Sequence, residues 1–308
     1  MAIASTSRTI VGYVPETTFG VTPATPAWQK FRRTGGNLDT VKTTVMSEEV
    51  RGDRNVVDEL QVAQDVKGSY DYEFSYGTFD ALLAAALGGT WTTNALVNGS
   101  SAQSFSFEES VDLGGSKTYN RFSGVMVDEV SLNIDSRAVI KGSMSLMGIA
   151  ETQATTIVTG ATYVEPNTEI IATELSVANL VVSGLVTPLK VKNLKLAIKN
   201  NLRIQDVVGS LNAVGFGIGQ CDITGSVDVF VEGIEAQQAM LAHSAPSISF
   251  TIGAVTNKKY SFLIPQARLL SGVRKLGGNR DDVMLSIPFR GIYDATTGGS
   301  IKILRAVA

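Results

Sequence analysis

Two stretches in opposite halves of the chain share one pattern: Lys67-Gly-Ser-Tyr-Asp-Tyr72 and Thr224-Gly-Ser-Val-Asp-Val229. Each has a Gly-Ser pair followed by alternating apolar and acidic residues. Because successive residues of a strand point to opposite faces, each stretch predicts a β-strand with one apolar and one polar face. The first stretch continues through Glu73 and Phe74 to Tyr76, so its aromatic residues share the apolar face.

Alternation of this kind recurs along the chain and predicts a protein that is mainly β. Further alternating segments are 130–135, 194–199, 227–232 and 283–287. Glycine pairs are expected to form turns between the strands, at 114–115, 277–278 and 298–299. Two short segments, 79–87 and 234–243, predict one α-helix in each half. Thr78 is expected to cap the first helix and Gly88 to end it.

The chain is predicted to contain one unit twice. When residues 38–89 are aligned with residues 195–246, the two Gly-Ser strands coincide and Val41 falls on Ile198. Each strand is then followed by one short helix. Past the helix the offset changes, as an insertion would cause, and Phe105-Ser-Phe107 matches Ile248-Ser-Phe250. The alternative is two β domains that share only this general pattern.

The predicted architecture is therefore a tandem duplication of β-sandwich or barrel units, each with one short flanking helix. The expected divisions are an N-terminal arm (1–34), a first β unit (35–150), a linker (151–175), a second β unit (176–295) and a C-terminal arm (296–308). Each unit has too few strands to close its sheet, and an open strand edge is a surface for association.

Composition narrows the classes of function. Charged residues make up 18% of the 308 residues, against roughly 25% in an average soluble domain, so much of the surface is expected to be covered by other protein. A net charge of −3 provides no basic field for binding nucleic acid. The single cysteine and single histidine exclude an internal disulfide and any site that needs two histidines or several cysteines.

The sequence does not predict an enzyme or a cofactor site. The glycines of Gly215-Phe-Gly-Ile-Gly219 do not have the spacing of a phosphate-binding loop, and a strand is expected where a helix should begin. His243 is expected at a helix C-terminus, where a cation is favoured by the helix dipole. The neighbouring carboxylates Glu108 and Glu109 are interpreted as solvated loop charge. We expect no catalytic, cofactor-binding or metal-binding residues.

No membrane association or targeting is expected. The longest apolar run, 81–87, is far shorter than the roughly 20 residues that span a bilayer, and the N-terminus lacks the apolar segment of a signal peptide. The chain is therefore expected to be soluble.

One charged segment between two predicted strands, Met46 to Glu59, is longer than an ordinary hairpin connection. Two interpretations remain open. The segment is a solvated loop, or it is a docking arm whose mixed charges pair across a protein interface.

Several segments resemble the major tail tube proteins of long non-contractile-tailed bacteriophages. They are the opening Pro15-Glu-Thr-Thr-Phe-Gly-Val-Thr-Pro23, the run 47–54, the Gly-Ser strand with its helix, and residues 277–289. This resemblance implies a β-sandwich with one flanking helix per unit. It also implies that subunits join edge to edge in rings, that the rings stack into a hollow tube conducting DNA, and that long loops and terminal arms link ring to ring.

The resemblance gives two sets of candidate site residues. Candidates for inter-ring contacts are the charged residues of the long loop: Glu48, Glu49, Arg51, Asp53 and Arg54. Basic side chains bind phosphate strongly, so the lumen should not be basic. Candidates for the lumen are the acidic residues on the polar faces of the two Gly-Ser strands: Asp71, Glu73, Asp228 and Glu232. The alternative is that this face is the solvated outer one.

The predicted partners follow from the same resemblance. The chain is expected to assemble with itself, three copies to a ring with pseudo-sixfold symmetry if the unit is duplicated, and six copies otherwise. Tape-measure, tail terminator and tail-tip proteins are the other expected partners, and double-stranded DNA passes without specific binding. The expected location is the virion tail, after assembly in the host cytoplasm. The alternatives are a capsid decoration protein, the inner tube of a contractile tail, and a monomeric β-rich binding protein.

Overall fold

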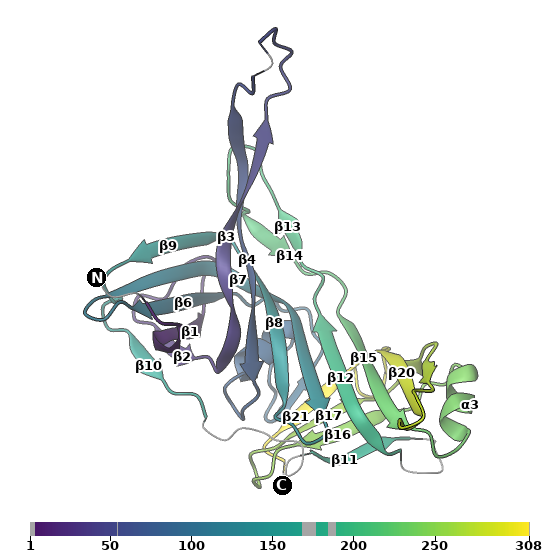
Figure 1. Cartoon of the computed structure of the whole chain (residues 1–308). Helices are drawn as coiled ribbons and strands as arrows, with labels where there is room; N and C mark the ends of the chain where they lie inside the picture. Colours follow the sequence, from purple (N-terminus) through teal and green to yellow (C-terminus); the bar gives the residue numbers. More distant parts are fainter. Residues whose placement is uncertain (1–3, 54, 168–176, 184–188, 308) are drawn as a thin grey trace.

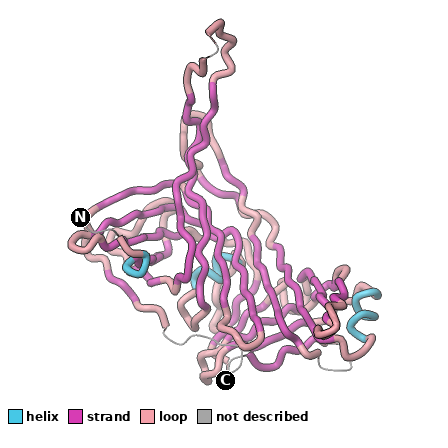
Figure 2. The backbone as a smooth tube through the Cα atoms, in the orientation of Figure 1, coloured by secondary structure: helices cyan, strands magenta, loops and turns pink. Residues whose placement is uncertain are grey.

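The computed structural model describes residues 4–53, 55–167, 177–183 and 189–307, and it confirms a mainly β protein. Strands dominate the described chain, and two α-helices of seven residues each stand apart from one another (Figure 2). These are α1 (Asp80–Ala86) and α3 (Glu235–Leu241), near the predicted positions. A short 3-10 helix, η1, spans Thr6–Arg8.

The strands fall into two groups along the chain. Those of the first half are β1 (Thr9–Pro15), β2 (Ala27–Lys30), β3 (Arg33–Met46), β4 (Glu59–Glu73), β5 (Ala95–Val97), β6 (Phe105–Asp112), β7 (Lys117–Asp135), β8 (Lys141–Gly148), β9 (Ala150–Ala154) and β10 (Thr162–Val164). Those of the second half are β11 (Val177–Val182), β12 (Val191–Lys199), β13 (Arg203–Gln205), β14 (Gly215–Gly217), β15 (Asp222–Phe230), β16 (Ile248–Ile252), β17 (Tyr260–Ile264), β18 (Ala267–Leu269), β19 (Val273–Lys275), β20 (Met284–Gly291) and β21 (Lys302–Arg305).

A single sheet layer runs through both halves in the order β3, β4, β8, β7, β12, β15, β20, and then β18 and β19 (Figure 1). The halves meet where β7 pairs antiparallel with β12. Leu132 lies opposite Leu196 at this joint, and both side chains are buried. Backbone pairing and apolar burial together make the two halves one continuous layer.

Other strands cover the apolar face of this layer. In the first half they are β10, β2, β1, β6 and the first part of β7, which is long enough at 19 residues to belong to both layers. In the second half they form a five-stranded sheet in the order β11, β16, β17, β21, β5. Because β5 comes from the first half, the two halves are interlocked.

The apolar faces predicted for the Gly-Ser strands are confirmed at the core. Tyr70 and Tyr72 of β4 and the following Phe74 are buried, as are Val227 and Val229 of β15. Val231, also expected on this face, lies past the end of β15 and is exposed. The helices differ more than their lengths suggest. Helix α1 buries four residues, whereas α3 buries only one.

Two local predictions are wrong. The Thr78 side chain does not cap α1; its hydroxyl instead hydrogen-bonds the Ser75 hydroxyl at 2.8 Å. Glu108 and Glu109 are buried in β6 rather than solvated in a loop. Arg121 donates to Glu108 at 2.7 Å and the Tyr70 hydroxyl donates to Glu109, so each carboxylate has a partner on its own face of the sheet.

The two halves share one order of strand pairing. In the first half β3 pairs with β4, β4 with β8, and β8 with β7; in the second, β12 pairs with β15, β15 with β20, and β20 with β18. In the covering layers, β1-β6-β7 corresponds to β11-β16-β17. Gly68 lies opposite Leu38, and Gly225 lies opposite Leu196. When the two halves are superposed on these pairs, Val41 corresponds to Lys199. The predicted alignment of Val41 with Ile198 is therefore wrong by one residue.

The segments expected as arms and linker contribute strands to these sheets. Residues 1–34 contain β1 and β2, residues 151–175 contain most of β9 and all of β10, and residues 296–308 contain β21. Part of the expected linker, 168–176, lies outside the described residues.

Candidate assembly surfaces

The hairpin formed by β3 and β4 projects well beyond the rest of the molecule (Figure 1). We call residues 41–62 the arm. Its strands end at Met46 and resume at Glu59, so the loop at its tip has the bounds of the charged segment between the two predicted strands. Apolar side chains are exposed along both strands and at the tip: Val41, Val45, Met46, Val50, Val56, Val57, Leu60 and Val62. An exposed apolar surface of this extent is typical of a protein contact site.

The charged candidates lie at the tip of the arm. Glu48, Glu49, Arg51 and Asp53 are exposed, and Arg54 lies outside the described residues. Arg51 donates to Asp53 at 3.0 Å. The pKa of Asp53 is lowered, first by the backbone N–H of Asn55 and then by Arg51. The tip therefore presents charged groups beyond two strands on which exposed apolar and polar residues are mixed.

A second projection lies beside the base of the arm (Figure 1). It is the connection between β12 and β15, residues 200–221, and it contains the hairpin of β13 and β14. The backbone N–H of Gln64 donates to the carbonyl of Leu211 at 2.7 Å. The exposed apolar residues of this second projection are Val207, Val208, Leu211 and Val214.

Sequence reasoning missed this second projection because it considered the glycines at 215–219 only as a loop. The available signal was the length of the connection between two predicted strands, the same signal that left a docking arm open as one interpretation of residues 46–59. The two projections occupy equivalent places in their halves, between β3 and β4 and between β12 and β15.

The acidic lumen candidates lie at the polar face of the continuous sheet. Asp71 and Glu73 alternate with the buried Tyr70 and Tyr72 of β4, so they point away from the core. Asp228 of β15 lies on the same face of the sheet, and its carboxylate forms an ion pair with Lys275 of β19 at 3.7 Å.

Glu232 lies past the end of β15, which stops at Phe230, and it pairs with Lys190. The structure therefore brings Asp71, Glu73 and Asp228 to one sheet face, and it places Glu232 at the margin of that face.

Small hydroxyl side chains are frequent on this polar face. The cross-strand registers align Asp71, Ser143, Ser131, Ala197 and Thr224 in one row across five strands. The next row contains Glu73, Lys141, Asn133, Lys195 and Ser226. The face is thus polar with both signs of charge, and it is not a basic surface.

The continuous sheet ends at two strand edges. Among the described residues, β3 pairs only with β4, while β18 and β19 pair only with β20. These strands stand at opposite ends of the sheet layer (Figure 1). Each leaves a row of backbone groups available for pairing with another chain.

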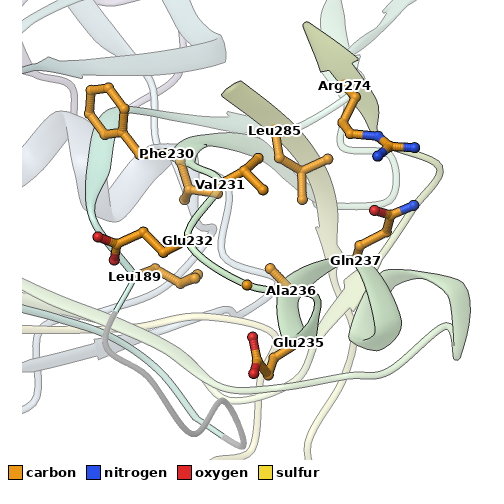
Figure 3. Close-up of a pocket in the computed structure, with 11 residues that line it drawn as sticks. Leu189, Phe230, Val231, Glu232, Glu235, Ala236, Gln237, Arg274 and Leu285 are labelled. Carbon is orange, nitrogen blue, oxygen red and sulfur yellow. The ribbon is translucent and has the colours of Figure 1, made fainter. Parts of the chain in front are cut away.

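A small pocket lies between the end of β15, α3 and β20 (Figure 3). Its lining combines apolar residues such as Val229 and Leu285 with Glu232, Glu235 and Arg274. In the described part of the chain, no three His, Cys, Asp or Glu residues are arranged to hold a metal ion. No helix among the described residues is long and apolar enough to cross a membrane.

Continuous sheets, open edges and apolar projections define a β-rich assembly protein. The family model described as phage tail tube protein matches residues 6–291, and the chain belongs to this family. It is therefore a structural component of the virion tail. A search of curated proteins found no match to the chain.

Proposed function

We propose that the chain is the subunit of a non-contractile phage tail tube, whose rings stack to form the channel for DNA ejection. The observation that carries this proposal is the pair of strand edges, unpaired among the residues that the structure describes, at opposite ends of one sheet in a chain that matches the tail tube family. Two different edges that meet head to tail generate a ring when the rotation closes. Assembly takes place in the host cytoplasm, and tape-measure, terminator and tail-tip proteins complete the tail.

The ring contains three chains, because each chain provides two tube units. The shared pairing order of the halves supports an internal duplication. The first unit comprises β1 to β4 and β6 to β10, and the second comprises β11 to β21 together with the borrowed strand β5. Electron microscopy of the purified protein at high concentration is expected to show rings or tubes, and native mass spectrometry to show trimers. Hexamers would contradict the duplicated tube unit, and monomers at all concentrations would contradict the tube function.

The arm connects one ring to the next. Its exposed valines and charged tip reach beyond the sheet and are expected to be ordered against a neighbouring ring. Reversing the charges of Arg51 and Arg54 to glutamate is expected to shorten the tubes while the subunit unfolds at its usual temperature. The matched control replaces both arginines by lysine, which keeps the charge. Tubes of normal length from the charge-reversed variant would contradict this role.

The polar sheet face forms the wall of the channel. Asp71 and Asp228 oppose the adhesion of DNA phosphates, and the small hydroxyl residues between them leave the wall smooth. Replacing both aspartates by lysine is expected to leave tubes intact and to slow DNA ejection more strongly at low salt, because counterion release depends on salt. The control variant with both aspartates replaced by asparagine is expected to have a weaker effect. A tube structure with both carboxylates on the outer surface would contradict this assignment.

A further inference from the structure

We propose that the free edge of β3 in one copy pairs antiparallel with residues 271–277 of the next copy. The partner is a second copy of this chain, and the joint reproduces the pairing of β7 with β12 inside the chain. This inference rests on the proposed ring function, and it deepens that function by naming the strands and their register.

The template is the joint between the halves. Asp135 lies opposite Asn193, and the pairing continues without interruption to Glu129 opposite Lys199. Leu132 and Leu196 are opposite one another at its centre and are almost fully buried. The joint therefore combines a complete backbone ladder with an apolar contact.

The strand that corresponds to β7 in the second half is the run through β18 and β19. Gly68 pairs with Leu146 and Gly225 pairs with Phe289, so these two partners are equivalent. One strand further, Leu146 lies opposite Val127 and Phe289 lies opposite Leu269.

Both strands then change register by one residue. Beyond the shift, Ser131 lies opposite Ser143, while Val273 lies opposite Ser286. The second half thus repeats the irregularity as well as the order of pairing. Val273 takes the place of Ser131, and Lys275 takes the place of Asn133.

The strand that corresponds to β12 in the first half is β3, because Leu38 and Leu196 lie opposite equivalent glycines. The N–H of Leu38 points away from β4 and reaches only the Glu109 carboxylate, at 3.5 Å. The carbonyl of Gly36 accepts a hydrogen bond from the Arg33 side chain at 2.8 Å. These backbone groups are held by side chains, and a pairing strand can replace those contacts.

Transferring the internal register gives specific neighbours across the new joint. Leu38 lies opposite Arg274 in a hydrogen-bonded pair, as Leu196 lies opposite Leu132. Asn37 then lies opposite Lys275, and Asp39 lies opposite Val273. On this face Asp39 and Lys275 are diagonal neighbours of opposite charge, which favours the antiparallel register.

Burial at the internal joint and exposure at the open end of the sheet support the same assignment. Ile134 is 7% exposed beside β12, whereas Leu276, at the equivalent position, is 68% exposed in the single chain. A neighbouring β3 would cover this leucine.

The helices repeat this contrast. Helix α1 lies at the internal joint, where Arg305 donates to Asp80 at 2.6 Å and Asn200 donates to the carbonyl of Ala85 at 3.2 Å. Helix α3 lies at the open end, with Ile234 and Leu241 exposed. The next copy is therefore expected to cover α3 as the second half covers α1.

Disulfide trapping tests the register. Asp39→Cys and Val273→Cys are combined in a chain whose own thiol is removed by Cys221→Ser. A non-hydrogen-bonded antiparallel pair places its Cα atoms about 4.5 Å apart, within the range that a disulfide accepts. Assembled protein is treated with oxidised glutathione, which takes up the two electrons as each disulfide forms. We expect a ladder of linked chains on non-reducing gels that ends at the closed ring.

The matched control combines Val41→Cys with Lys275→Cys on the same strands. The predicted register separates these positions by roughly 13 Å, so the control is expected to give at least tenfold less linked chain. Rings in the microscope without linkage of the first pair, or with equal linkage of both pairs, would overturn this joint and leave the ring function standing. Failure of the unmodified chain to form rings would overturn both.

A second variant tests the edge without cysteine. Arg274→Pro removes the N–H that is expected to point towards the neighbour, whereas Arg274→Ala keeps it. Ring formation is expected to be lost in the proline variant and retained in the alanine variant, with similar circular dichroism for both free subunits. Rings formed equally well by both variants would also overturn the joint.

Discussion

The two halves of the chain build the same order of strands with different side chains. The first half fills its core with aromatic residues from β4, while the second half places Val227 and Val229 at the equivalent positions of β15. The strand β12 is enclosed between β7 and β15, whereas its equivalent β3 has one free edge among the described residues. The two halves therefore share a strand order although their core side chains differ in size, and we expect this difference in size to decide how much each half contributes to stability.

The largest expected effect comes from removing an aromatic side chain of the first core. Tyr72 lies 4.6 Å from Phe79 between ring centroids, and its hydroxyl donates to the carbonyl of Ser131 at 2.9 Å. Tyr72→Ala is expected to lower the free energy of unfolding by about 4 kcal/mol, against about 2 kcal/mol for Val229→Ala. Urea denaturation of the free subunit measures both values. Equal losses would show that the two cores contribute alike.

The second prediction concerns the close approach of strands at the paired glycines. A Cβ atom at Gly225 would lie 2.3 Å from the Lys195 carbonyl oxygen and 2.4 Å from the Phe289 ring. Gly225→Val is expected to lower the free energy of unfolding by about 3 kcal/mol, because the new side chain presses against β12, which is held between β7 and β15 and cannot move away. Gly68→Val is expected to cost less, since β3 has a free edge and can move.

The control for this comparison is Gly115→Val, since no other atom lies within 4 Å of a Cβ atom there. Its free energy of unfolding is expected to change by less than about 0.5 kcal/mol. A larger cost at Gly68 than at Gly225 would contradict the view that enclosure of the strand sets the penalty.

The third prediction separates the two helices. Leu241 is 75% exposed at the end of α3, while Ala86, the last residue of α1, is buried. Leu241→Ser is expected to leave the free energy of unfolding within about 0.5 kcal/mol. It is expected to raise the concentration needed for ring formation about tenfold, because the neighbouring copy no longer buries the leucine. Light scattering measures assembly, and an unchanged threshold would contradict contact at α3.

The smallest expected effect concerns Glu109, whose aligned position in the second half is the apolar Ile252. Burial raises the pKa of Glu109 in the folded chain. The folded state then holds the proton more tightly than the unfolded state, so this contribution to stability is greatest below the ordinary carboxyl pKa. It is lost as the pH rises through the raised value.

Glu109→Gln removes this titration. The free energy of unfolding of the unmodified chain is expected to fall relative to that of this variant as the pH rises above the ordinary carboxyl pKa towards neutrality. Thermal or urea unfolding across this range measures the difference. Parallel pH profiles for the two proteins would exclude Glu109 as the titrating group.

The sequence by itself determined the β class, the short helices and the apolar faces of the Gly-Ser strands. Alternation has a period that only a strand satisfies, so Tyr70, Tyr72 and Phe74 had to share a face. The connection after Met46 is longer than an ordinary hairpin needs, but its length left a solvated loop and a docking arm equally open.

Only the tertiary structure decided which faces and edges are covered. Local pattern cannot show that Glu108 and Glu109 are buried, because their partners Arg121 and Tyr70 come from other strands. It also cannot set the register of β3, where the backbone pairing corrects the alignment by one residue. Pairing between strands far apart in sequence joins β7 to β12 and places β5 beside β21, and within the described part of the chain it leaves one edge of β3 and one of β19 unpaired. Long-range contacts rather than local preference fix these neighbours.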